Sequence, residues 1–315
     1  MNDISSLDFQ HYLIDQTESL TPLPSTVIKL ISLASRADSR IEDVEEVLRA
    51  DVALAAVVLS EANSASSGAS SSIATIRGAV VRLGNSRVAA IAANRSISGS
   101  EASLPLAAYD LEPGELVRHS QVASYVAETI HRLGPQKVVG EVVAAALLHD
   151  LGQVVLDQIL DPALFRQARR VCRDVCDAER ELVDTDHAEV GAYLLKIWGI
   201  PRKIITSVRF HHEPAKGTED LAYAVNIASQ IADYVESMTS IATEFPDLAQ
   251  RHSAAEAQYE TLVTNTSHSL DRIGLGLDRI VEESIKSLVR VGLLASDPLV
   301  SVVQSDEQQK PSAVD

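Results

Sequence analysis

Residues 142–152 read VVAAALLHDLG, an apolar run that ends in an adjacent histidine and aspartate. The run is rich in alanine and leucine, which lose little side-chain entropy in a helix, so it predicts a buried helix ending at His149 and Asp150. In the sequence before it, residues 8–98 show helical patterns and no convincing alternation of the kind that marks a half-buried strand. The stretch and its surroundings therefore predict an all-α fold with a polar pair at the end of a core helix.

Further histidines and one aspartate lie on or beside other predicted core-facing helical faces. His119 shares its face with Val122, and the helix expected to start at Pro201 leads up to two adjacent histidines. With the pair above, the set comprises His119, His149, Asp150, His187, His211, His212 and Asp233. Asp233 has polar helical neighbours, so its orientation is left open.

A single histidine on an apolar face is usually a core residue that is hydrogen-bonded to the backbone. Five such histidines together are harder to explain, because burying many unpaired polar groups is costly. The side chains are therefore expected to satisfy one another in a metal-free polar network or to hold a cation. Imidazole and carboxylate groups are suitable ligands for Zn²⁺, Mn²⁺, Fe or Ni²⁺, and metal binding is the favoured alternative.

The length and charge of the chain narrow the classes of function. Its 315 residues can bury one large or two medium cores, and its formal net charge of −17 disfavours nonspecific binding to nucleic acid. No uninterrupted apolar run has membrane-spanning length, and residues 1–10 lack the basic-then-apolar pattern of a signal peptide. Cys172 and Cys176, expected one turn apart on a helix, are interpreted as free thiols. These features predict a cytoplasmic protein.

Composition divides the chain into four parts. We expect an N-terminal helical half over residues 1–108, a helical half with the histidines over 109–237, further helices over 238–297 and a disordered tail over 298–315. In the first part, Asp51 is expected to open an almost wholly apolar helix, suited to full burial, that ends near Asn63. A loop rich in serine and glycine is expected to follow over residues 64–72.

The histidine motifs resemble those of a known family. LLHDLG at 147–152 looks like the signature of the HD superfamily of metal-dependent phosphohydrolases, and RHSQVA at 118–123 is similar to the helix with its first histidine. DHAEVGA at 186–192, WGIP at 198–201 and HHEP at 211–214 resemble the HDOD branch, which is related to the HD-GYP cyclic-di-GMP phosphodiesterases. AVVRLG at 79–84 resembles a motif in the N-terminal half of HDOD domains. The resemblance covers roughly residues 20–234.

The resemblance implies an all-α fold and a bacterial, cytoplasmic, regulatory role with a protein partner or a small ligand. It implies that the seven histidines and aspartates named above hold one or two metal ions. As the competing interpretation, it implies a metal-dependent phosphohydrolase acting on a nucleotide or another phosphoester, with His149 and Asp150 at its catalytic centre. Two departures count against that activity: Gln153 replaces a lysine of the HD-GYP branch, and PAKG at 214–217 replaces its Gly-Tyr-Pro segment.

Overall fold

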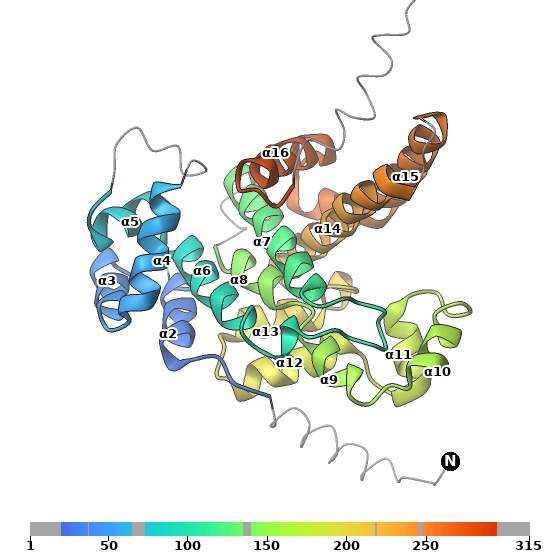
Figure 1. Ribbon diagram of the computed structural model, residues 1–315, viewed down its shortest axis with the longest axis horizontal. Coiled ribbons are helices and arrows are strands. Elements are labelled where there is room, and N and C mark those ends of the chain that lie inside the picture. The colour runs from blue at the N-terminus through green and yellow to red at the C-terminus, as the bar shows by residue number, and fades with distance from the viewer. Residues whose placement is uncertain are drawn as a thin grey trace, which may run out of the picture.

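The computed structural model describes residues 20–294, except residues 37, 65–72, 135–139, 218 and 245–247. Within these residues the regular structure is helical, and the only β-type pairing is an isolated bridge between Leu106 and Leu111 (Figure 1). The predicted all-α class is therefore confirmed. No described helix combines the length and apolar character that a bilayer crossing requires.

The N-terminal half consists of short helices whose ends follow local sequence signals. The Asp51 side chain accepts a hydrogen bond from the backbone N–H of Leu54 at 2.9 Å, which caps the following helix. Gly84, at a φ of 77°, separates the last two helices through a left-handed conformation that glycine adopts without strain. The helices are α2 (Ser25–Ala34), α3 (Ile41–Arg49), α4 (Val52–Asn63), α5 (Ile76–Leu83) and α6 (Asn85–Ile97).

Helix α4 corrects one expectation from the sequence. Its ends lie where they were predicted, but Val52 is 81% exposed, and only one face, which includes Leu54 and Val58, is buried. No other described helix covers the face of α4 that carries Val52, so the apolar residues on that face stay exposed. The predicted loop after it covers residues 64–72, of which 65–72 lie outside the described residues.

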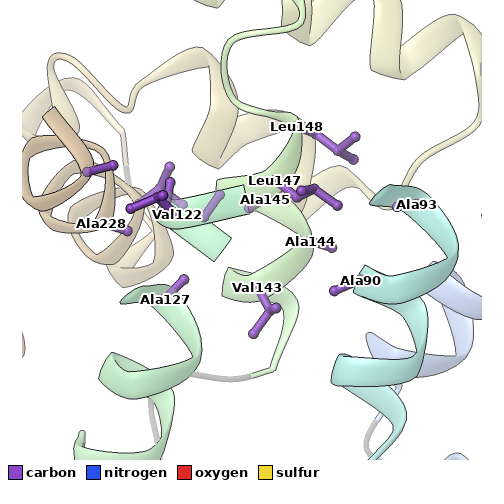
Figure 2. Close-up of a cluster of buried hydrophobic side chains, with 14 of the residues drawn as sticks. Ala90, Ala93, Val122, Ala127, Val143, Ala144, Ala145, Leu147, Leu148 and Ala228 are labelled. Atoms are coloured by element: carbon purple, nitrogen blue, oxygen red, sulfur yellow. The ribbon is translucent and has the colours of Figure 1, made fainter. Parts of the chain in front are cut away.

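The central helices surround α8 (Glu141–Leu148), whose residues are all buried. Helix α8 packs against α6, α13 (Arg202–Arg209), α14 (Asp220–Glu244) and α7 (Glu115–Leu133). Figure 2 shows why the helices can approach closely: Ala90 and Ala93 of α6 face α8, while Ala127 of α7 and Ala228 of α14 lie on its other side. The small side chains let α8 place its C-terminal end deep in the core.

Shorter helices border this centre on the side of the histidine motifs. Helix α9 (Gly152–Asp157) packs against α12 (His187–Ile197), while α10 (Pro162–Ala168) packs against α11 (Val175–Val183). Both cysteines are free, but Cys172 lies in the turn before α11 and Cys176 lies within it. The expectation that they share a helix is therefore wrong, because the chain bends between them.

The C-terminal helices extend the same core. Helix α14 packs along α15 (Leu248–Ile273), and α16 (Leu277–Arg290) lies against α7 (Figure 1). The four-part division of the chain stays a prediction; helix α14 continues across its boundary at residue 237. The N-terminal segment and the expected disordered tail over 298–315 lie outside the described residues.

Candidate metal centre

The structure brings the predicted histidines and aspartates together from five helices. Helix α7 supplies His119, the end of α8 supplies His149 and Asp150, and the first residue of α12 is His187. His211 and His212 follow α13, and Asp233 lies on α14. The histidine side chains are almost fully buried except for that of His212, whereas the Asp233 side chain is 60% exposed. One side of the cluster therefore reaches solvent.

Local hydrogen bonds fix the direction of two imidazoles. Nδ1 of His149 donates to the carbonyl oxygen of Ala146 at 2.8 Å, and Nδ1 of His211 donates to that of Val208 at 2.6 Å. A carbonyl oxygen can only accept, so Nδ1 carries a proton in both rings. Nε2 is an acceptor in each ring that carries this one proton.

Asp150 lies at the centre of the cluster. Its Oδ1 atom is 3.3 Å from Nε2 of His149, 3.3 Å from Nε2 of His187 and 3.6 Å from Nε2 of His211. Its Oδ2 atom is 3.8 Å from Nε2 of His119. One carboxylate thus faces four imidazoles, and its two oxygens face different histidines.

Three of these atoms are buried without a hydrogen-bond partner: Nε2 of His149, Nε2 of His211 and Oδ1 of Asp150. All three are acceptors when the imidazoles are neutral, so they cannot satisfy one another. Leaving such groups unsatisfied in a protein interior costs about 1–3 kcal/mol each. Divalent cations bound among these side chains would satisfy such acceptors, and the residues present therefore fit metal binding.

The candidate ligands form overlapping groups rather than a single one. One group joins Asp150, His187, His211 and His212, and another joins Asp150 with His119 and His149, each with its ligand atoms within 4.8 Å of one another. A third contains His119, Asp233 and Glu236. Asp150 and His119 are shared between groups, an arrangement that suits one or two ions.

Glu236 was not predicted from the sequence. Its Oε2 atom lies 3.2 Å from Nδ1 of His119. The Oδ1 atom of Asp233 lies 3.6 Å from the same nitrogen. The available signal was its spacing, because residues three apart on a helix share a face. The side chain therefore adds a carboxylate to the solvent-facing group.

Glu179 of α11 was also missed. It is fully buried, and it accepts hydrogen bonds from the backbone N–H of His187 and from Nδ1 of that ring, both at 2.9 Å. The hydroxyl of Tyr109 donates to Glu179 at 2.6 Å. A carboxylate that holds Nδ1–H directs Nε2 of the same ring toward the cluster, as buried carboxylates do for metal-binding histidines. The charged sequence of α11 resembled an exposed face and gave no sign of this role.

Burial and neighbouring charges set the protonation of the two central residues. Burial would raise the pKa of Asp150, but the surrounding imidazoles outweigh it and hold that pKa well below its usual value. Burial lowers the pKa of His149 to about 3. The pair is therefore a charged carboxylate beside a neutral imidazole, which are the forms that bind a metal.

Known proteins share sequence and fold with this chain. Residues 20–214 match the HDOD domain family. A curated "Uncharacterized protein" of Treponema pallidum is 26% identical over 218 residues, which are 66% of this chain, and the chain spans about 40% of that protein's length.

Solved structures share the fold. A "Putative phosphohydrolase" from Shewanella amazonensis superposes with a TM-score of 0.59 at 23% identity, covering 90% of this chain and 96% of that one. A "Putative signal transduction protein" from Marinobacter aquaeolei gives a TM-score of 0.58 at 21% identity, covering 95% and 67%. Since the family match extends over more than half of the sequence, the chain belongs to the HDOD domain family.

Proposed function

We propose that this protein is a cytoplasmic signalling module that binds a protein partner or a small ligand, and that its His/Asp cluster holds one or two divalent transition-metal ions. The observation that carries the metal site is that three buried acceptor atoms, on His149, His211 and Asp150, have no hydrogen-bond partner. In this proposal the metal ties α7, α8, α12 and the segment after α13 together. Its role is structural or sensory.

Two features support a regulatory role over a catalytic one. Gln153 is buried on α9, where the related phosphodiesterase branch has a lysine that could assist at a phosphate. Glu213, which follows the two histidines, lies 2.6 Å from the ammonium of Lys216 and 3.4 Å from the guanidinium of Arg180. Its carboxylate is therefore already engaged by two cations.

A metal-dependent phosphohydrolase acting on a nucleotide or another phosphoester is the second candidate. The exposed Asp233 favours it, because that side of the cluster is open to solvent. A bound divalent ion would supply Lewis acidity and lower the pKa of a coordinated water. Asp150 and His149 would then be the central binding residues of the active site.

Metal analysis of the purified protein tests the site itself. We expect wild-type protein loaded with Mn²⁺, Fe²⁺, Zn²⁺ or Ni²⁺ to retain at least one of these metals after gel filtration. The Asp150→Asn variant should retain much less, because it removes the central charge at nearly constant shape. Asp271→Asn, on the exposed surface of α15, is the matched control and should behave as wild type. Retention of no metal under any loading condition would contradict both candidate functions.

Turnover of a phosphodiester and nucleotide panel with added Mn²⁺ separates the two candidates. The signalling proposal predicts no turnover above a metal-only blank. Turnover by wild-type protein that is lost in folded His149→Ala and Asp150→Ala variants would refute it and establish the phosphohydrolase.

A further inference from the structure

A second candidate site lies away from the His/Asp cluster. A cavity of about 310 Å³ is walled by α4, α5 and α6 of the N-terminal half together with α7 and α16. None of the cluster residues lines it. The cavity therefore joins the N-terminal half to the C-terminal helix α16.

The lining of this cavity is unusually basic for so acidic a chain. Five lining side chains are cationic and three are carboxylates, whereas the whole protein has a formal net charge of −17. The cations are Arg82, Arg87, Arg132, Lys286 and Arg290. A local positive surplus in a concave site raises the local concentration of anions, because the walls of the cavity focus the field of the charges.

The three carboxylates are already engaged by three of the cations. Glu61 and Glu128 lie 3.1 and 3.4 Å from the Arg87 guanidinium, which also stacks on the ring of Tyr125 at 3.9 Å. Glu283 lies 3.4 Å from Arg132 and 3.1 Å from Lys286. These pairs leave no lining carboxylate for the remaining two arginines.

Arg82 of α5 and Arg290 of α16 have no hydrogen bond or ion pair with any other described residue. Nη1 of Arg82 is buried without an acceptor. An unsatisfied buried guanidinium nitrogen is unfavourable, so an anionic acceptor that contacts Arg82 from the cavity would relieve it. The orphaned donor is therefore a specific observation in favour of an anion at this end of the cavity.

We propose that the cavity binds a small phosphorylated molecule, with Arg82 and Arg290 as its principal contacts. The planar guanidinium fork matches the oxygens of a phosphoryl group better than it matches a single point charge. Ser287 also lines the cavity, and its hydroxyl can donate to such a ligand. Its volume is near the lower end of the roughly 300–1,000 Å³ usual for ligand pockets, which suits a diphosphate or a small nucleotide.

This inference goes beyond the proposed function, and it does not depend on the metal. A ligand held by Arg82 and Arg290 would link α5 to the C-terminal end of α16. It would thereby stabilise the packing of α16 on the rest of the protein, which gives a signalling module a ligand-dependent change remote from its His/Asp cluster.

Calorimetric titration of the full chain with inorganic pyrophosphate and with ADP tests the proposal. We expect both to bind wild-type protein, and Arg82→Gln and Arg290→Gln to weaken binding about tenfold or more, since each removes charge-assisted hydrogen bonds. Arg279→Gln and Arg95→Gln are matched controls: both arginines are exposed, and neither lines the cavity. The controls should bind as wild type does.

Several results would overturn the proposal. Failure of both pyrophosphate and ADP to bind at millimolar concentration would remove the site. An equal loss of affinity in the control variants would indicate nonspecific charge attraction. Citrate binding as tightly as pyrophosphate would refute the preference for phosphate. Metal content, measured on the same samples, should be unchanged in all four variants, so failure here is distinguishable from failure of the metal site.

Discussion

Replacing Gly152 with alanine tests how strictly the metal centre depends on the contact between α9 and α12. A β-carbon at residue 152 would lie 1.9 Å from the carbonyl oxygen of His187 and 2.7 Å from the amide nitrogen of Gly191. Real β-carbons essentially never approach other atoms within 3.0 Å, so the two helices would have to separate by about 1.1 Å at the closer contact. Both obstacles are backbone atoms, and no side-chain rotation relieves them. Overpacking of this kind costs about 1–3 kcal/mol, and we expect the upper end of that range.

The same displacement should weaken metal binding, because the obstructing carbonyl belongs to a residue of the cluster. Metal–ligand distances tolerate deviations of about 0.2 Å, which is much smaller than the required movement. Urea denaturation and metal analysis of Gly152→Ala measure the two effects. Gly99→Ala is the control, because its nearest neighbouring atoms would be 3.9 Å from the new β-carbon. The reasoning is refuted if Gly152→Ala unfolds at the wild-type urea concentration and retains the wild-type amount of metal.

Four other outcomes are expected. Glu179→Gln should weaken metal affinity by about 10- to 100-fold, measured against a competing chelator, because it loosens the orientation of His187; unchanged affinity would contradict that role. Phe165→Ala should lower the free energy of unfolding in urea by about 3–5 kcal/mol, since the ring is fully buried. A loss below about 1 kcal/mol would contradict this expectation and show that neighbouring side chains fill the space left by the ring. Asp51→Ala should cost about 1 kcal/mol through loss of the cap on α4, and an unchanged denaturation midpoint would argue against the cap. Removal of the metal with a chelator should lower the Tm of the protein, since a bound metal at a hundred times its Kd stabilises the folded state by about 2.7 kcal/mol. Equal Tm values with and without metal would contradict a structural role for the metal.

Local signals located several helix ends correctly. Asp51 and Pro201 mark helix starts as expected, because capping and a fixed φ act within a few residues. Burial was harder to predict from composition, as Val52 demonstrates. Whether an apolar face is covered depends on which helix packs against it, and that is a property of the whole fold.

For the candidate site, the sequence by itself determined that five histidines and Asp150 lie on or at the end of inward-facing helical stripes, and it left the orientation of Asp233 open. Only the tertiary structure decided that Asp150 lies among four imidazoles and that three buried acceptor atoms have no hydrogen-bond partner. It also added Glu179 and Glu236, and it brought Arg82 of the N-terminal half and Arg290 of α16 to one cavity. The physical reason is the sequence separation over which each signal acts. Helical periodicity orients a side chain relative to its own helix, whereas contacts between residues far apart in the chain depend on the packing of several helices at once.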